Sequence, residues 1–223
     1  MPHAVVVGGN RGIGLEMVRQ LLERDAPAWR VSVVCRTPTD ELGALTAQVH
    51  SGVDITTDAG INATRSALDG QPIDLLVLVA GVLERNPLEP LDVASIRKQF
   101  ELNALAPLRV VAALRAQLPA GAKVALLTSR MGSIGDNDSG SHYGYRMSKA
   151  ALNAAGKSLA VDLAPAGVAV GILHPGYVRT RMTGNSGLID ADESARLLLA
   201  RIDELNASNS GTFRHANGDE LPW

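Results

Sequence analysis

The sequence predicts an α/β fold in which a mostly parallel, doubly wound sheet of seven strands carries helices on both faces. Short, β-branched apolar runs alternate with helical patterns along all 223 residues. Four of these runs are almost continuously apolar, as strands buried on both faces are. Repeated strand–helix units favour right-handed crossovers and a parallel sheet. Because no linker, repeat or low-complexity stretch divides the chain, we expect a single domain over residues 1–223.

The predicted elements follow one another in regular alternation. The strands are 3–7 (HAVVV), 30–35 (RVSVVC), a weak one ending near Asp54, 74–79 (DLLVLV), 123–128 (KVALLT), 168–173 (VAVGIL) and 211–215 (GTFRH). The helical patterns cover 13–24, 41–48, 59–69, 92–117, 145–164 and 191–206. Pro107 interrupts the longest of these helices, and its missing N–H group predicts a bend there.

Composition narrows the class of protein. Hydrophobic residues make up 46% of the chain and aromatic residues only 3%, so the core must be aliphatic. A net charge of −2 gives no electrostatic reason to expect nucleic acid or an anionic membrane as a partner. The single cysteine, Cys35, excludes an internal disulfide and suits a reducing compartment. No apolar run approaches the ~20 residues of a membrane span. We therefore expect a cytoplasmic protein.

A glycine-rich turn follows the first predicted strand. In "VVVGGNRGIGLEMVRQLLE", Gly8, Gly12 and Gly14 have the spacing G-x3-G-x-G and lead into an amphipathic helix. Glycine allows a backbone to adopt positive φ and to approach a pyrophosphate closely. The helix that follows directs its amide groups at the same anion. Close strand–helix packing would also explain the glycines, but their place on the first strand–helix turn favours dinucleotide binding.

Two arginines indicate which dinucleotide is bound. An NAD site usually has an acidic residue about 20 residues after the glycines. Here the second strand ends in "VVCRTP", with Arg36 and no acid before Asp40, and Arg11 lies within the glycine turn. Two guanidinium groups would favour a ribose 2′-phosphate through charge and paired hydrogen bonds. If both arginines are not simply solvated, NADP(H) is favoured over NAD(H).

"YGYRMSK" (143–149) places two tyrosines near one lysine. Residues four apart share a helix face, so Tyr145 lies beside Lys149. Tyr143 is six residues from Lys149, about 600° of helix rotation, and points away from it. A free phenol has a pKa of about 10, and a nearby ammonium would lower that pKa. An ordinary pair on a helix surface would have the same spacing, so the role of the pair depends on the other motifs of the chain.

Six motifs in this order resemble the short-chain dehydrogenase/reductase family, over nearly the whole chain. They are "GGNRGIG" (8–14), "VAG" (79–81), Asn103 in "ELNALAP", "TSRMGS" (128–133), "YRMSK" (145–149) and "PGYVRT" (175–180). The stretch from 128 to 153 and the ending "GTFRHANGDELPW" look most like the C-factor and sniffer-type carbonyl reductase branch. The resemblance implies a single-domain Rossmann fold and an NAD(P)H-dependent reductase.

The resemblance also implies a catalytic set of Ser129, Tyr145, Lys149 and Asn103. Tyr145 would protonate a carbonyl oxygen, Ser129 would hydrogen-bond it, and Lys149 would hold the phenolate and the ribose. Asn103 would anchor a water linking Lys149 to solvent, unless it only bonds locally within its helix. Ser133 stays a second candidate for the serine, because the gap from Ser129 to Tyr145 exceeds the usual one. The extra residues fall in the polar stretch "GDNDSGSH" (135–142).

The remaining implied contacts are with the cofactor. Asp54 matches a position that meets the adenine ring, although an aspartate there could equally cap the next element. The full set implied for cofactor binding is Gly8, Asn10, Arg11, Gly12, Ile13, Gly14, Arg36, Asp54, Ile55, Ala80, Gly81, Tyr145, Lys149, Pro175, Gly176, Val178 and Thr180.

The sequence thus predicts a reductase that converts an aldehyde or ketone to an alcohol by hydride transfer, with tyrosine as proton donor. The alternative is a dinucleotide-binding signalling protein of C-factor type with little or no turnover. The five histidines lack metal-ligand spacing, so no metal is expected. The helices at 92–117 and 145–164 could form the four-helix bundle of a homodimer or homotetramer, or be covered within one subunit. The substrate, beyond being a small carbonyl compound, is left open.

Overall fold

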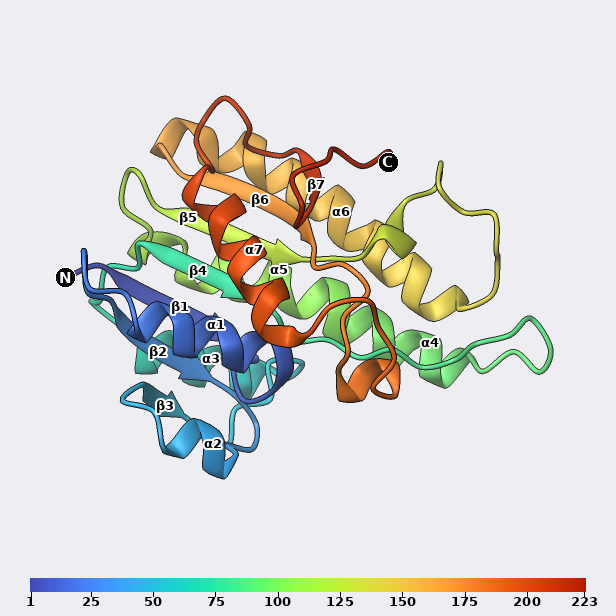
Figure 1. The fold of residues 1–223 in the computed structure, drawn as a ribbon, viewed down its shortest axis with the longest axis horizontal. Coiled ribbons are helices and arrows are strands. Elements are labelled where there is room, and N and C mark those ends of the chain that lie inside the picture. Colours follow the sequence, from blue (N-terminus) through green and yellow to red (C-terminus); the bar gives the residue numbers. More distant parts are fainter.

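The computed structural model describes all 223 residues as one parallel sheet between two layers of helices (Figure 1). Its seven strands lie in the order β3-β2-β1-β4-β5-β6-β7, and all neighbours pair in parallel. The predicted fold class is confirmed. The strands are β1 (His3–Val7), β2 (Arg30–Val34), β3 (Gln48–His50), β4 (Leu75–Leu78), β5 (Lys123–Leu127), β6 (Ala169–His174) and β7 (Phe213–His215).

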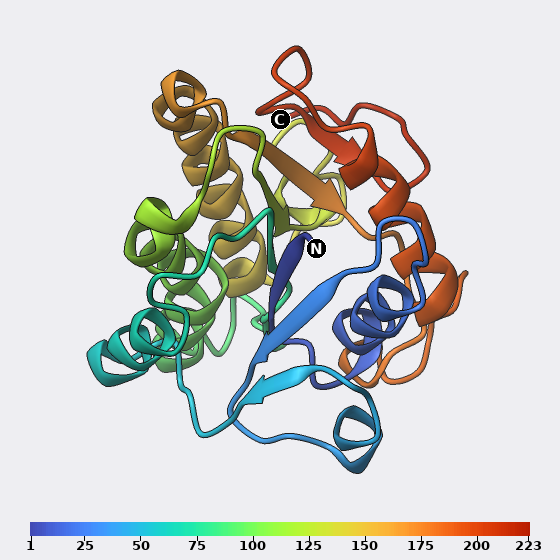
Figure 2. The same ribbon diagram turned by 90° about the vertical axis from the view of Figure 1, so that its left-hand side faces the viewer.

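The helices divide between the two faces of the sheet (Figure 2). The α-helices are α1 (Gly12–Leu22), α2 (Asp40–Gly43), α3 (Asp58–Ala67), α4 (Val93–Phe100), α5 (Ala106–Leu114), α6 (Tyr143–Leu163) and α7 (Ala191–Asp203). Helices α3, α5 and α6 cover one face, whereas α1, α2 and α7 cover the other. No helix of the structure is long and apolar enough to cross a membrane.

Alternation along the first strand explains why two separate cores form. Val5 and Val7 contribute to the core beneath α5 and α6, while Ala4 and Val6 contribute to the core beneath α1 and α7. Successive side chains of a strand point to opposite faces, so an apolar run supplies both cores at once. The almost continuous apolar character of β1 therefore has a direct structural cause.

Three element predictions differ from the structure. The weak strand predicted to end near Asp54 ends at His50, at the edge of the sheet, where only one neighbour fixes its length. The helix predicted over 41–48 is a single turn, α2, since Gln48 already belongs to β3. The long helix predicted over 92–117 is divided into α4, a π-helical turn at Glu101–Leu105, and α5.

The order of the strands determines where a ligand can bind. The chain moves from β1 outward to β3 and then returns to β4 on the other side of β1. In an open parallel sheet the crevice at such a reversal, outside the carboxyl ends of the strands, is the usual ligand site. Gly8 follows β1, and Ala80 and Gly81 follow β4, so these predicted cofactor residues lie at the reversal.

Candidate active site

The glycine turn after β1 is tight in the way its sequence predicts. Gly8 has φ +94°, and a Cβ there would lie 2.6 Å from the backbone nitrogen of Ala80. Close packing of the β1 and β4 turns therefore requires this glycine. Gly12 has φ +52° at the start of α1, which Arg11 precedes without a capping side-chain hydrogen bond. The amide groups at this end of α1 thus have no side-chain acceptor and suit an anion.

Asn10 joins the glycine turn to the loop after β2. Its side-chain nitrogen donates to the carbonyl of Thr37 at 2.9 Å, and its own carbonyl accepts from the Thr39 hydroxyl at 2.9 Å. These bonds bring the turn that carries Arg11 to the loop that carries Arg36. Both arginines are exposed and neither makes an ion pair. Their guanidinium groups are therefore free to receive an anion.

Asp54 lies at the same end of the sheet but is tied to its own turn. One carboxylate oxygen accepts from the backbone N–H of Thr56 at 3.0 Å and from its hydroxyl at 2.7 Å. These hydrogen bonds, with Arg36 nearby, lower the pKa of Asp54. Asp54 thus closes the turn before α3, whereas the N-cap of α3 is Thr57, so the alternative in which Asp54 caps the next element is wrong. Ile55 packs its side chain into the core, so only its backbone can face a cofactor.

Tyr145 and Lys149 are brought together as the helical spacing predicts. Both are buried on α6, at 7% and 4% exposure, whereas Tyr143 is 37% exposed. The Lys149 Nζ lies 5.8 Å from the centre of the Tyr145 ring and donates to the Leu127 carbonyl at 2.9 Å. Ser129, two residues after β5, lies close enough to Tyr145 for its hydroxyl to lower the pKa of the phenol. Three side chains from two elements thus meet at one buried point.

The pKa values of the pair differ from the expectation. Burial raises the pKa of Tyr145 to about 12, against a smaller lowering by the Ser129 hydroxyl. Burial lowers the pKa of Lys149 to about 8. The expected lowering of the tyrosine pKa by lysine is therefore wrong for this structure, because desolvation of the phenol outweighs every other effect. Near neutral pH the phenol is protonated and the lysine carries a charge.

Ser133, the alternative serine, is engaged elsewhere. Its hydroxyl accepts from the backbone N–H of Asp136 at 3.1 Å and so caps a turn. The Ser129 hydroxyl accepts from the N–H of Met131 at 3.1 Å and also reaches Tyr145. The geometry therefore favours Ser129 as the partner of the phenol.

Asn103 lies in the π-helical turn between α4 and α5. Its side-chain oxygen accepts from the Val82 N–H at 2.8 Å, and its nitrogen donates to the Val82 carbonyl at 2.8 Å and to the Ser148 hydroxyl at 3.0 Å. Its bonds are therefore long-range rather than local to its helix. A Cβ at Gly81 would lie 3.2 Å from the Asn103 oxygen and 3.7 Å from the Lys149 Nζ. Asn103, Gly81 and Lys149 thus surround the same small space.

The turn after β6 meets the glycine turn. The Ser194 hydroxyl of α7 donates to the Pro175 carbonyl at 2.8 Å, and Gly176 has φ +93°. Val178 is buried, while the Thr180 methyl would lie 3.6 Å from a Cβ at Gly12. Thr180 of the turn after β6 therefore lies against the glycine turn after β1, whereas Gly176 faces Ile189 and His215.

A buried polar network supports the residue before Tyr145, and the sequence analysis missed it. Gln99 of α4 donates to the side-chain oxygen of Asn86, and Asn86 donates to the Ser95 hydroxyl at 3.0 Å. A Cβ at Gly144 would lie 2.6 Å from polar atoms of both Asn86 and Gln99. One feature of the sequence could have indicated this network. Ser95 and Gln99 are polar, and because they are four residues apart they lie on the same face of a helix.

Gly144→Ala is therefore expected to lower the free energy of unfolding by about 1–3 kcal/mol, because the added methyl must displace buried polar atoms. The measurement is urea unfolding. Gly43→Ala is the matched control, since a Cβ at Gly43 meets no atom within 4 Å. Equal stability changes in the two variants would contradict the packing described.

The lowered pKa of His174, at the end of β6, should make the free energy of unfolding depend on pH. Burial, the His215 ring at 4.8 Å and the Arg130 cation lower its pKa to about 3, while Asp136 opposes the change. The unfolded chain takes up a proton near pH 6.5 that the folded chain resists, so stability falls as pH falls from 6.5 toward 3. At pH 5 the loss is about 2 kcal/mol, from ~1.36 kcal/mol per pH unit.

His174→Gln should therefore show a smaller loss of stability than the parent protein between pH 7.5 and pH 5. Urea unfolding of both proteins at the two pH values gives the comparison. An identical loss in both would show that His174 does not carry this proton linkage. The buried ring of His3, whose pKa burial also lowers, remains in both proteins and leaves the comparison unaffected.

Comparison with known proteins agrees with this geometry. Residues 2–188 match the family model described as short chain dehydrogenase. The chain is 39% identical, over the whole of both chains, to a 1-hydroxy-2-glutathionyl-2-methyl-3-butene dehydrogenase of Rhodococcus sp. (strain AD45). It is 45% identical over 155 residues to the C-signal protein of Myxococcus xanthus, covering 68% of this chain and 93% of that one.

Two solved structures share the complete fold. The carbonyl reductase Sniffer of D. melanogaster superposes with a TM-score of 0.91 at 28% identity and full coverage of both chains. An NADPH-bound carbonyl reductase from chicken fatty liver gives a TM-score of 0.90 at 28% identity, covering 100% of this chain and 99% of the other. The similarity thus extends over all seven strands.

Proposed function

This chain belongs to the short-chain dehydrogenase family of NAD(P)H-dependent oxidoreductases, and we propose that it reduces an aldehyde or ketone to an alcohol with NADPH. The observation that carries the proposal is the buried Ser129–Tyr145–Lys149 set beside the glycine turn. When bound, the cofactor would supply the hydride. The protein would supply the proton, the site for the carbonyl oxygen and the exclusion of water.

The residues present fit a dinucleotide. Gly8 makes the β1 turn tight, and the start of α1 offers amide groups without a side-chain acceptor. Arg11 and Arg36 supply two unpaired cations at the adjoining loop, which favours a ribose carrying a 2′-phosphate. Thr180 lies against Gly12, and Pro175 and Gly176 precede it in the turn after β6. These residues would hold the cofactor.

Tyr145 would act as the general acid. At neutral pH its phenol keeps its proton, because burial raises its pKa to about 12. As negative charge develops on a carbonyl oxygen, the phenol can donate its proton, while Ser129 hydrogen-bonds the same oxygen. The charged Lys149 would stabilise the phenolate that is left. Asn103 would hold the backbone at Val82 and a water path to Lys149.

The identity to C-signal supports a second candidate, a dinucleotide-binding signalling protein with little turnover. A phenol, a hydroxyl and an ammonium that are all buried close together argue for catalysis, since binding alone does not need them. The two functions differ in an observable way. A signalling protein would bind NADPH and leave it unoxidised with every carbonyl compound.

The test is a titration of the purified protein with NADPH and NADH, followed by absorbance of the reduced cofactor with a panel of aldehydes, ketones and diketones. Glutathione-conjugated aldehydes belong in the panel, because the Rhodococcus relative is named for a glutathionyl alcohol. Oxidation of NADPH that requires a carbonyl compound would support the reductase. Tight NADPH binding without oxidation would favour the signalling protein.

A further inference from the structure

One side chain ties together the long loop between Ser129 and Tyr145. The guanidinium of Arg146 donates from Nε to the Gly140 carbonyl at 3.1 Å and from Nη2 to the Ser139 hydroxyl at 2.8 Å. Its Nη1 makes a longer contact of 3.5 Å with the Met131 carbonyl. Arg146 therefore joins the first residue of the loop 131–142 to residues near its end.

The loop needs such a clamp because its end is strained. Ser141 and His142 have φ +56° and +52°, and they follow Gly140 at φ +59°. A left-handed conformation is unfavourable for a residue with a side chain, because it brings Cβ close to the following carbonyl oxygen. Two such residues in succession persist only when surrounding contacts hold them. The Arg146 bonds fall on Ser139 and Gly140, directly before the strained pair.

The other side-chain bonds of the loop do not attach it to a regular element. Arg130 pairs with Asp136, and Asn137 accepts from the Gly140 N–H at 3.1 Å, so these bonds lie within the same stretch of chain. The Gly135 N–H donates to the carbonyl of Trp223, in the segment after β7, at 2.7 Å. Arg146, by contrast, extends from α6 and follows Tyr145 directly.

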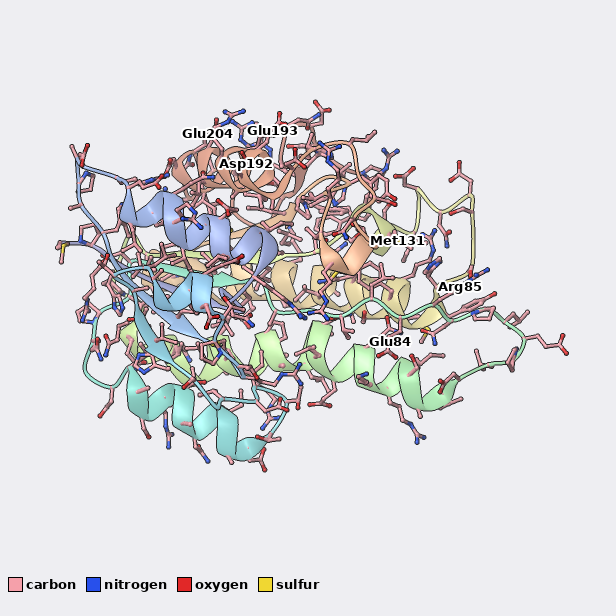
Figure 3. The ribbon with its side chains drawn as sticks, turned by 60° about the horizontal axis from the view of Figure 1, so that its bottom comes forward. Glu84, Arg85, Met131, Asp192, Glu193 and Glu204 are labelled. Carbon is pink, nitrogen blue, oxygen red and sulfur yellow. The ribbon has the colours of Figure 1, made fainter.

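The loop also borders the place where a carbonyl group would react. It begins two residues after Ser129 and ends three residues before Tyr145. Figure 3 shows Met131 at the same end of the molecule as Glu84 and Arg85 of the segment after β4. The segments after β4 and β5 thus lie at the same end of the molecule. Because the loop 131–142 joins Ser129 to Tyr145 along the chain, a shift of this loop would change the space available to a substrate.

We infer that Arg146 is a positioning residue that holds the loop 131–142 as one wall of the substrate site, so that it controls the affinity for the carbonyl substrate. This inference rests on the proposed reductase function. Ser129 and Tyr145 keep their own supports, the end of β5 and the packing of α6. The chemical step should therefore depend on Arg146 much less than substrate binding does.

Arg146→Met is expected to raise KM for the carbonyl substrate about 10-fold, which corresponds to about 1.4 kcal/mol, because the loop loses its hydrogen bonds to a charged donor. The change in kcat and in the Kd for NADPH should stay below about 3-fold, because the contacts of Arg146 with the loop involve neither the catalytic side chains nor the residues implied for cofactor binding. Arg146→Lys should recover only part of KM, because a single ammonium cannot span Met131 and Gly140 as a fork does. Arg65→Met, which removes an exposed and unpaired arginine from α3, should match the parent protein.

Hydrogen exchange gives a readout that does not depend on turnover. Arg146→Met should accelerate exchange of the amides in 131–142, including those of Gly135 and Gly140, and leave the sheet unchanged. If no carbonyl compound of the panel leads the parent protein to oxidise NADPH, the proposed function fails. The exchange measurement still decides whether Arg146 holds the loop 131–142. Unchanged exchange in the loop, acceleration throughout the molecule, or a fall in kcat without a rise in KM would each overturn the inference.

Discussion

Tyr145→Phe is expected to lower kcat/KM for carbonyl reduction about 10³-fold. The substitution removes the phenolic proton that the proposed mechanism transfers to the carbonyl oxygen, and general acid catalysis contributes typically ~10²–10⁴-fold. The ring itself remains, so its packing at 7% exposure is kept. The Kd for NADPH should change little. Steady-state absorbance with a fixed substrate, together with cofactor titration, measures both quantities.

Tyr143→Phe is the matched control, because it removes the same hydroxyl two residues earlier on the same helix. Tyr143 is 37% exposed, and α6 turns it away from Lys149. The kcat/KM of the Tyr143→Phe variant should stay within about 2-fold of the parent protein, because the side chain is exposed and lies outside the site. Substantial activity in Tyr145→Phe, or an equal loss in both variants, would show that Tyr145 is not the proton donor.

Arg36→Gln is expected to raise the Kd for NADPH about 10- to 100-fold and to leave the Kd for NADH nearly unchanged. The guanidinium makes no ion pair within the chain, so its charge is available to a 2′-phosphate. A hydrogen bond to a charged group contributes about 1.5–3 kcal/mol, and 1.4 kcal/mol is a factor of ten. Arg11→Gln should act in the same direction.

Fluorescence titration with both cofactors gives the two constants for each variant. Arg115→Gln is the control, since Arg115 is exposed and lies between α5 and the amino end of β5, whereas the glycine turn follows the carboxyl end of β1. It should alter neither constant. Equal weakening of NADPH and NADH by Arg36→Gln would mean that the arginine supports the loop rather than recognises a phosphate. A parent protein that prefers NADH would show that both arginines were misinterpreted.

The sequence predicted most of the scaffold because its central strands are buried on both faces. The β1, β4, β5 and β6 segments are almost wholly apolar, which leaves few alternatives to a parallel sheet between helices. The choice of Tyr145 over Tyr143 followed from helix rotation alone. Both features depend on local periodicity, which a single sequence contains in full.

The features that the sequence did not predict depend on contacts between distant segments. Edge strand β3 is short because only β2 pairs with it, and no periodicity marks its end. The π-helical turn aims Asn103 at Val82, a partner 21 residues away in the chain. The raised pKa of Tyr145 comes from burial, which depends on the whole fold.

The arrangement of the loop 131–142 is another feature that the sequence did not predict. Its polar composition predicted a turn-rich segment of extra length, but not that Arg146 would join its two ends. The motif "YRMSK" drew attention to Tyr145 and Lys149, while the arginine between them had no expected partner. Only the position of the loop relative to α6 shows what that residue contacts.

The measurement that tests the central claim most directly is the transfer of deuterium from NADPH labelled at the hydride position to an aldehyde or ketone. The protein is incubated with labelled cofactor and carbonyl compound, and the alcohol is examined by mass spectrometry and NMR. We predict one deuterium per molecule of alcohol, on the former carbonyl carbon, and a loss of product in Tyr145→Phe. Tight binding of NADPH with no labelled alcohol from any compound of the panel would contradict the account.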